Sequence, residues 1–399
     1  MELDELIGLR KSGYTLPAEF YLSPEIYRLD LDRMLFKHWH CAGHVSQIPN
    51  AGDWIELAID IESVIVIRGD DGTIRALANV CRHRGSRICD GPSGHATRGR
   101  LTCPYHAWVY RTDGSLAQAR MMPDDFQTAD HGLATLPVHV TEGLIFVSLE
   151  AGPLALDEVD HMLRGTIGPL GWVDAKVVHT ETFSIAANWK LALENQVECY
   201  HCAPSHPEFF KVHSQGRADI AAARLETLAR AKTQGIDIPS RDQWALAAMP
   251  GQEADYCNRY AMWGGAVTAS EDGQRVAPLM GFTEPDGGFT IFYVGALNHF
   301  LAYADYGAIF RYAPRSVDRT DLVVTWLVHG DAQPGVDYDL ERLTWLWRVT
   351  AAADCRIVEA NQQGVSSRFY EPGPYVVPIE SSTERLVEWY LHALTVQSH

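Results

Sequence analysis

The sequence lacks long hydrophobic runs and is poor in basic residues. No run of about 18 apolar residues, the length needed to span a bilayer, occurs in the chain, and the sequence begins with the acidic stretch MELDELIGLRKSGY. We therefore expect neither a membrane span nor a secretion signal, and we expect a cytoplasmic protein. Only 33 Lys and Arg stand against 51 Asp and Glu, a formal charge of −18. This balance disfavours nucleic acids and anionic membranes as partners and favours cationic ligands and a basic partner surface.

G-x-G-x-x-G loops, internal repeats and low-complexity tracts are missing as well. Cysteine is sparse, with eight residues among 399, and a long chain without a leader predicts reduced thiols rather than a disulfide framework. Apolar residues are abundant: 46% of the chain is hydrophobic and 10% aromatic, enough to fill the cores of two domains. Five of the cysteines are most simply interpreted as packing residues, namely Cys41, Cys199, Cys202, Cys257 and Cys355.

Two short motifs that each pair a cysteine with a histidine are the most informative feature of the chain. The first runs C-x-H-R-G and carries Cys81 and His83; the second runs C-P-Y-H and carries Cys103 and His106. Two thiolates and two imidazoles in this mixed order suit a Rieske [2Fe-2S] centre, in which the thiolates hold one iron and the imidazoles the other. A structural zinc ion also accepts two Cys and two His, but zinc sites usually pair like with like at short spacing. A cluster of this kind predicts one-electron transfer.

With Trp108 added, the pair C-x-H-R-G and C-P-Y-H-x-W resembles the cluster loops of Rieske non-haem iron oxygenase large (alpha) subunits. The resemblance implies that the two cysteines and two histidines above bind the cluster. It also implies that Cys89 is a neighbour of the cluster and not a ligand.

A second group of potential metal ligands follows in the middle of the chain. Residues 188–201 contain no helix breaker and Pro204 limits their extension, so we predict one helix that ends just after His201. Glu198 and His201 then share one face, and His206 lies in the next turn, where it can point to the same spot. Two imidazoles and one carboxylate form the facial triad of non-haem Fe(II) oxygenases. Taken alone, helical histidines are more often packed or hydrogen-bonded than metal-bound.

The run N-W-K-L-x-x-E-N-x-x-E-C-Y-H-C, which starts at Asn188, is similar to the catalytic-domain motif of Rieske oxygenases, especially the branch that oxidises quaternary ammonium compounds. By this match His201 and His206 bind mononuclear Fe(II), and Asn195 lies near the iron, although a polar helical residue is as readily solvated. Glu198 would bridge a cluster histidine of one subunit to an iron histidine of the next in a head-to-tail homotrimer. An ordinary surface role for a helical Glu is the alternative.

The third iron ligand is expected far along the chain. Residues 337–364 have helical spacing, an apolar face and no proline. Asp354 falls within the apolar stripe, where a carboxylate needs a partner or a metal. A salt bridge with Arg348 or Arg356 is the alternative. The segment D-C-R-I-V-E-A-N-Q-Q-G resembles the family segment that carries the third ligand, which favours Asp354 over Glu359.

The motifs and patterns divide the chain into three parts and predict an α+β protein. Residues 39–155 contain short alternating stretches broken by Gly, Pro and Asp turns, which predicts an all-β Rieske domain. Residues 156–399 mix helices with strands; the resemblance implies a helix-grip catalytic domain in which an antiparallel sheet is covered by helices. Residues 1–38 are expected to form a helical segment packed on that catalytic domain. Residues 218–237 are expected to be helical and to cover the active site.

The resemblance extends over most of the chain and implies a terminal oxygenase component. Its cofactors would be the Rieske cluster and the mononuclear Fe(II), with O2 as co-substrate. Because the sequence has no nucleotide-binding glycine loop, electrons from NAD(P)H would arrive through a separate flavin and iron–sulfur reductase. The C-terminal block resembles that of glycine betaine and stachydrine demethylases, which favours hydroxylation of an N-methyl group of a quaternary ammonium or betaine substrate, N-demethylation and release of formaldehyde.

Aromatic side chains are expected to hold such a quaternary ammonium group, because cation–π attraction requires no hydrogen bond. Hydroxylation of an aromatic ring on the same scaffold is the alternative activity, and a large, non-catalytic Rieske electron carrier is the alternative outside enzymes. Aromatic residues at strand spacing are also common in cores. Six lie where the family's pocket forms: Tyr260, Trp263, Tyr293, Phe300, Tyr303 and Tyr306.

Overall fold

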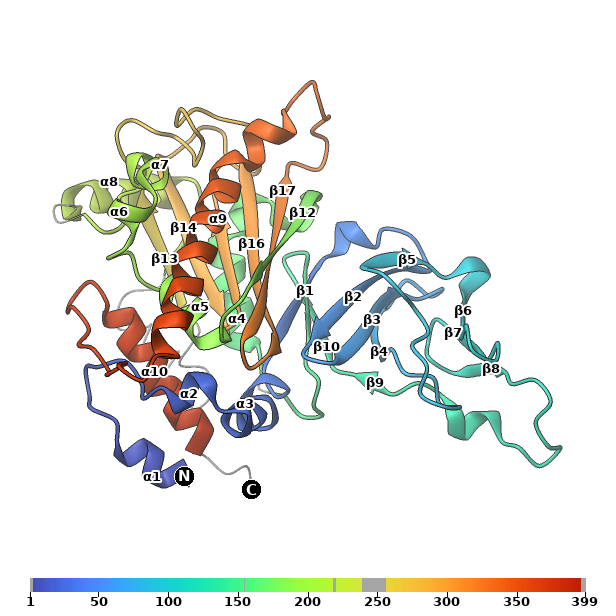
Figure 1. Ribbon diagram of the computed structural model, residues 1–399. Helices are drawn as coiled ribbons and strands as arrows, with labels where there is room; N and C mark the ends of the chain where they lie inside the picture. Colours follow the sequence, from blue (N-terminus) through green and yellow to red (C-terminus); the bar gives the residue numbers. More distant parts are fainter. Residues whose placement is uncertain (1–2, 154, 218–219, 239–255, 396–399) are drawn as a thin grey trace. The chain divides into compact units, whose positions relative to one another are not determined.

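The computed structural model describes residues 3–153, 155–217, 220–238 and 256–395. The chain forms two compact units. Residues 37–153 make one unit, here called the Rieske unit; the residues before 37 join those after 153 in the other, here called the catalytic unit (Figure 1). Among the described helices, none combines the length and the apolar character needed to cross a lipid bilayer.

The Rieske unit consists of three antiparallel sheets, as the alternating pattern predicts. Its core includes Ile65, Ile67, Leu77, Trp108 and Tyr110, all buried. The five-stranded sheet has the order β5 (Ser93–His95), β2 (Asp53–Ile59), β3 (Glu62–Arg68), β4 (Ile74–Ala78), β9 (Thr135–Leu136); the three-stranded sheets have the orders β6 (Arg100–Thr102), β7 (Val109–Arg111), β8 (Leu116–Gln118) and β1 (His40–His44), β11 (Leu144–Val147), β10 (Val138–Thr141).

A six-stranded antiparallel sheet forms the centre of the catalytic unit and confirms the predicted α+β class. Its order is β12 (Lys176–Ile185), β17 (Arg319–Val328), β16 (Tyr306–Ser316), β15 (Asn298–Ala302), β14 (Gly288–Val294), β13 (Tyr256–Ala261). The helix predicted over 337–364 is α9 (Leu340–Val365), whose N-cap Asp339 accepts a hydrogen bond from the backbone N–H of Arg342. The edge of the Phe310 ring packs on Trp347 of α9, with centroids 5.0 Å apart, so α9 covers one face of the sheet (Figure 1).

The other helices of the catalytic unit are shorter. The helix expected over 218–237 is α8, which packs against β13 and β14. The bounds are α1 (Leu3–Gly8), α2 (Glu19–Leu22), α3 (Pro24–Asp30), a π-helical turn (Leu31–Leu35), α4 (Asp157–Thr166), α5 (Trp189–Gln196), α6 (Cys202–Ser205), α7 (Pro207–Val212), α8 (Ala221–Thr233) and α10 (Ser381–Thr395).

A buried polar cluster ties the N-terminal helices to the catalytic unit. Asp30, at the end of α3, is fully buried and pairs with the ammonium group of Lys190 on α5. The indole N–H of Trp189 donates to Asp30 at 3.0 Å and the hydroxyl of Tyr390 on α10 donates at 2.8 Å. Burial raises the pKa of Asp30 above its usual value, although these three donors act in the opposite direction. A buried charge is tolerated when it is paired and hydrogen-bonded in this way.

Candidate metal centres

Two loops of the Rieske unit bring the predicted cluster residues together. Cys81 and Cys103 are 3% and 2% exposed, whereas His83 and His106 are exposed. The Nδ1 atoms of the two histidines lie 3.2 Å apart, so both rings turn the same nitrogen toward a shared point. Burial raises the pKa of the Cys81 thiol, and bound metal is what stabilises a thiolate in such surroundings. The donor set and its geometry fit a Rieske cluster.

The two loops have matching backbone turns. The carbonyl of Cys81 accepts from the N–H of Gly85, and the carbonyl of Cys103 accepts from the N–H of Ala107, both at 3.0 Å. The fourth residue after each cysteine is left-handed, with φ of +76° at Gly85 and +57° at Ala107. Glycine adopts this conformation without steric cost. Ala107 adopts it although its Cβ disfavours it, so the surrounding loop imposes the turn. Each histidine lies inside one such turn, which fixes its position beside its cysteine.

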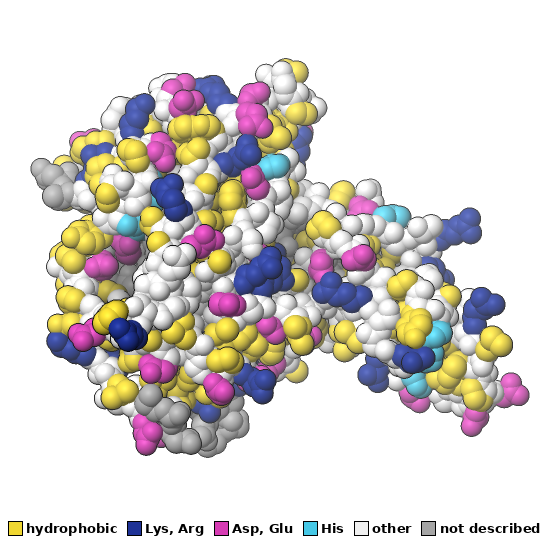
Figure 2. Space-filling model, viewed as in Figure 1, with side chains coloured by type: hydrophobic (Ala, Val, Ile, Leu, Met, Phe, Trp, Pro, Cys, Tyr) yellow, Lys and Arg dark blue, Asp and Glu magenta, His cyan; other side chains and the backbone are white. Residues whose placement is uncertain are grey.

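The surface around these loops is basic, although the whole chain is acidic. Arg82, Arg84 and Arg87 are exposed beside the first motif, and Arg98 and Arg100 are exposed before the second. Figure 2 shows histidine side chains at the surface of the Rieske unit bordered by Lys and Arg side chains.

The helix predicted over residues 188–201 is shorter in the structure. It begins after the N-cap Asn188 and ends at Gln196. The carboxylate of Glu198 accepts hydrogen bonds from the N–H of Tyr200 and from the ring of His201. These local hydrogen bonds favour a turn in place of a continued helix. The chain then enters α6 at His201, and Pro204 falls in the first turn of that helix, where its missing N–H is tolerated.

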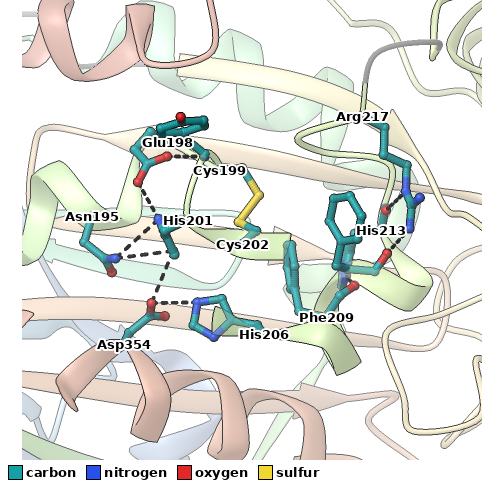
Figure 3. Close-up of a disulfide and its surroundings, with 12 residues drawn as sticks. Asn195, Glu198, Cys199, His201, Cys202, His206, Phe209, His213, Arg217 and Asp354 are labelled. Carbon is teal, nitrogen blue, oxygen red and sulfur yellow. Dashed lines mark hydrogen bonds and ion pairs between the residues drawn. A yellow bond between two sulfur atoms is a disulfide. The ribbon is translucent and has the colours of Figure 1, made fainter. Parts of the chain in front are cut away.

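Cys199 and Cys202 form a disulfide, which corrects the expectation that they are reduced packing residues (Figure 3). Their Cα atoms lie 4.9 Å apart, within the range that a disulfide bridges. The expectation rested on the length of the chain and on the expected cytoplasmic location, whereas the local C-x-x-C spacing is the signal that indicates a pair. The disulfide closes a turn that contains His201.

The predicted iron ligands converge in the catalytic unit. The Oδ1 atom of Asp354, on α9, lies 2.9 Å from Nε2 of His206 and 3.4 Å from Nε2 of His201. One ligand atom of each residue lies within 4.8 Å of the others (Figure 3). Within the described chain, Oδ1 of Asp354 and both ring nitrogens of His206 are buried without a hydrogen-bond partner. Nitrogen and oxygen atoms that converge on one point suit a cation, and two His with one carboxylate are the donors that Fe(II) takes in a facial triad.

The charged side chains at this site favour the binding of a cation. Burial lowers the pKa of His201, but Asp354 and Glu198 outweigh it and raise that pKa to about 9. Burial raises the pKa of Asp354, but His201 and His206 outweigh it and lower that pKa. The site therefore stabilises positive charge beside its carboxylates, and a metal ion supplies that charge in place of a proton.

Two of the residues that competed for these roles, Arg348 and Glu359, have other partners. Arg348, the alternative partner of Asp354, pairs with Glu181 at 2.8 Å and with Glu341 at 3.0 Å. Glu359, the alternative ligand, accepts from the N–H of Ala186 at 3.0 Å. The side-chain nitrogen of Asn195 lies 3.3 Å from Nε2 of His201, which places Asn195 against a predicted ligand.

A cavity of about 530 Å³, counted with its opening to solvent, adjoins these residues. No described residue of α8 is among the residues that line it. The described residues that line the cavity are Asn195, Gln196, Glu198, Cys199, His201, Cys202, His206, Phe209, Gln215, Ile291, Tyr293, His299, Phe300, Leu301, Trp347, Thr350 and Asp354.

Of the six aromatic residues expected around a substrate, Tyr293 and Phe300 border this cavity. The ring of Phe300 stacks on Phe292 at 4.4 Å, on the face of the sheet opposite to Tyr293.

The structure places the other four outside the cavity lining. Tyr303 stacks on Tyr306 at 4.7 Å in the core, Tyr260 stacks on Phe289 at 5.9 Å, and Trp263 packs under the guanidinium of Arg217.

Sequence reasoning missed four cavity residues with clear chemistry: Phe209, His299, Trp347 and Thr350. Helical spacing was the available signal for two of them, because Trp347 and Thr350 precede Asp354 by seven and four positions on one face of α9. His299 carried no comparable signal.

Comparisons with known proteins agree with this architecture. Residues 38–137 match the Rieske [2Fe-2S] domain, and residues 173–395 match the ring hydroxylating alpha subunit (catalytic domain). The chain belongs to the Rieske non-haem iron oxygenase alpha subunits, and it is an oxidoreductase with a [2Fe-2S] domain and a catalytic iron domain.

Individual relatives show which members of the family the chain is similar to. The chain is 35% identical over 398 residues to the glycine betaine monooxygenase oxygenase subunit of Chromohalobacter salexigens, covering 97% of this chain and 87% of the relative. It is 33% identical over 203 residues to the carnitine monooxygenase oxygenase subunit of Escherichia coli K12, which covers 50% of this chain and 54% of the relative. The fold is similar to that of the quaternary ammonium Rieske monooxygenase CntA in complex with L-carnitine, with a TM-score of 0.70, 23% identity, and coverage of 95% and 96% of the two chains.

Proposed function

We propose that the protein is a monooxygenase that hydroxylates an N-methyl group of a quaternary ammonium or betaine substrate and so removes that methyl group as formaldehyde. The observation that carries this proposal is the cavity beside His201, His206 and Asp354, which combines aromatic faces with carboxylates. The relatives named for glycine betaine and carnitine support the same substrate class.

The metal ligands are part of the proposal. Cys81, His83, Cys103 and His106 would hold the cluster; the iron would be held by His201, His206 and Asp354. When bound, these groups supply one-electron transfer and the activation of O2.

The cavity suits a cationic head group. The rings of Tyr293, Phe209 and Trp347 line it and offer π faces to a methylated ammonium group, which cannot form a hydrogen bond. Glu198 and Asp354 add negative charge, and no Lys or Arg lines the cavity among the described residues. Attraction of a quaternary ammonium ion and repulsion of anions follow from this lining.

The proposed reaction balances when a separate protein supplies the electrons. One atom of O2 enters a C–H bond of the methyl group and the other leaves as water, after two electrons and two protons are supplied. The resulting N–CH2OH group then loses formaldehyde, while the nitrogen keeps the electron pair of the broken C–N bond and the hydroxyl proton is released. A separate NAD(P)H-dependent flavin and iron–sulfur reductase would supply the electrons.

Glu198 would pass electrons between subunits of a homotrimer. Its carboxylate already accepts from His201 within one chain, and its second bond would come from a cluster histidine of a neighbouring copy. Carboxylates that orient metal-bound imidazoles in this way are common around metal sites.

A substrate screen tests the proposal. The purified protein with a surrogate reductase and NADH should consume O2 and release formaldehyde with N-methylated betaines, in equal amounts. Oxidation of aromatic acids without formaldehyde would replace the proposal by ring hydroxylation, and cluster reduction without O2 uptake for any compound would make the protein an electron carrier.

A further inference from the structure

Besides the predicted iron ligands, two residues that line the cavity have a buried polar atom without a hydrogen-bond partner within the described part of the chain. These atoms are Nδ1 of His299, on β15, and Oγ1 of Thr350, on α9. The two residues are 2% and 5% exposed. Buried side-chain polar atoms without hydrogen bonds are rare in native proteins, so two of them in one ligand cavity indicate partners that the ligand brings.

The hydrogen bond on the far side of the His299 ring determines what Nδ1 can do. Nε2 lies 3.0 Å from the carbonyl oxygen of Ala296, which only accepts, so Nε2 carries the proton. Burial lowers the pKa of His299 to about 3, although the Ala296 carbonyl acts in the opposite direction. The ring is therefore neutral near pH 7, and Nδ1 presents a lone pair. Tyr293 packs on the ring with centroids 4.1 Å apart, which holds this acceptor in place.

Thr350 supplies the complementary group. Its hydroxyl can donate as well as accept, and it lies one helical turn before Asp354 on the same face of α9. The residues that carry this neutral acceptor and this hydroxyl both line the cavity that also contains the predicted iron ligands.

We infer that His299 and Thr350 form a subsite for a hydroxyl group of the substrate, so that the quaternary ammonium compound oxidised by this protein carries an O–H group in addition to its N-methyl groups. This inference rests on the proposed function and names its substrate class more closely. An O–H group donates to Nδ1 of His299 while its oxygen accepts from Thr350. A methylene group at the same place leaves both atoms buried and unpaired, and a carboxylate oxygen there would face the lone pair of Nδ1.

Two substrate pairs that differ by one hydroxyl group test the inference: L-carnitine against γ-butyrobetaine, and choline against ethyltrimethylammonium. The holoenzyme should favour the hydroxylated member of at least one pair by about tenfold or more in kcat/KM for formaldehyde release, because a site built for a hydroxyl rejects the analogue that lacks it. Anaerobic calorimetry of the same pairs gives their dissociation constants and should show the same preference.

Variants separate hydrogen bonding from packing. His299→Phe keeps the ring on Tyr293 and removes the acceptor, so the preference should fall toward one. His299→Asn places an amide oxygen near the position of Nδ1 and should restore most of it, and Thr350→Val should reduce it. Thr383→Val is the matched control, because Thr383 also has a buried hydroxyl without a partner but lies on α10, outside the cavity lining.

The outcomes distinguish this inference from the proposed function. Retained visible absorption of the cluster, together with the full iron content of the wild type, shows that both units of a variant are folded. Equal use of both members of each pair by the wild type, or an unchanged preference in His299→Phe, overturns the hydroxyl subsite and leaves N-demethylation standing. If the wild type oxidises no N-methylated compound, the proposed function fails and the subsite assignment fails with it.

Discussion

The carboxylate of Glu198 accepts a hydrogen bond from Nδ1 of His201, while Nε2 of the same ring faces Asp354 at 3.4 Å. The first contact fixes the ring so that its second nitrogen points to the predicted iron position. Second partners of metal-binding histidines commonly act in this way.

Replacement of Glu198 should separate metal assembly from electron transfer. Glu198→Gln keeps the size of the side chain but cannot accept hydrogen bonds from two imidazoles, so both metal centres should assemble while electron transfer slows by orders of magnitude. Stopped-flow reduction of the cluster followed by single turnover measures the effect. Glu208→Gln, on α7 outside the cavity lining, is the control. Single turnover at the wild-type rate in Glu198→Gln would remove the bridging role.

The three predicted iron ligands should lose their metal without disturbing the cluster. His201→Ala, His206→Ala and Asp354→Ala should each abolish turnover and remove about one iron per chain, because a facial triad has no spare protein ligand. Iron analysis and the Rieske absorption spectrum, recorded on the same samples, measure this. Glu359→Gln is the control that should keep its iron. An Asp354→Ala protein with full iron and activity would transfer the ligand role to another carboxylate.

The cluster cysteines should differ sharply from their neighbour Cys89. Cys81→Ser or Cys103→Ser should remove the visible absorption of the cluster, because serine does not replace the thiolate ligand. Cys89 is a predicted neighbour of the cluster and not a ligand, so Cys89→Ser should keep the spectrum. Zinc in place of iron at these residues would contradict the assignment of the whole motif.

Glu194 should make stability depend on pH. Burial raises its pKa to about 7, against the lowering influence of Tyr21, whose hydroxyl donates to it at 2.8 Å. A carboxyl group whose pKa is higher in the folded state contributes stability at low pH that is lost as pH rises through about 7. Urea unfolding between pH 5.5 and 8.5 should show wild type losing about 2 kcal/mol relative to Glu194→Gln. The exposed Glu226→Gln, on α8, should follow wild type, and parallel curves for Glu194→Gln would contradict the prediction.

Periodicity predicted the long helix that carries Asp354 and the mixture of helices and strands in the catalytic unit. The family resemblance, added to the motif spacing, predicted that His201, His206 and Asp354 meet. The sequence pattern failed where local side-chain contacts determine the backbone conformation. The Glu198 carboxylate caps a turn inside the predicted helix, and Cys199 forms a disulfide with Cys202 within that turn. Strand register was the other gap. Phe300 and His299 are adjacent in sequence but point to opposite faces of the sheet, and a pattern of aromatic residues cannot tell which face borders the cavity.

The buried cluster around Asp30 has a consequence for the order of folding. Lys190 lies 160 residues after Asp30 in the sequence, and Tyr390 lies 360 residues after Asp30. The Rieske unit, in contrast, is contiguous over residues 37–153. During synthesis the Rieske unit is complete long before the partners of Asp30 leave the ribosome. The N-terminal helices therefore cannot complete their core until α10 has been synthesised. Contacts so distant in sequence fold slowly, and the N-terminal helices are therefore the part of the nascent chain with the longest exposure to chaperones and proteases.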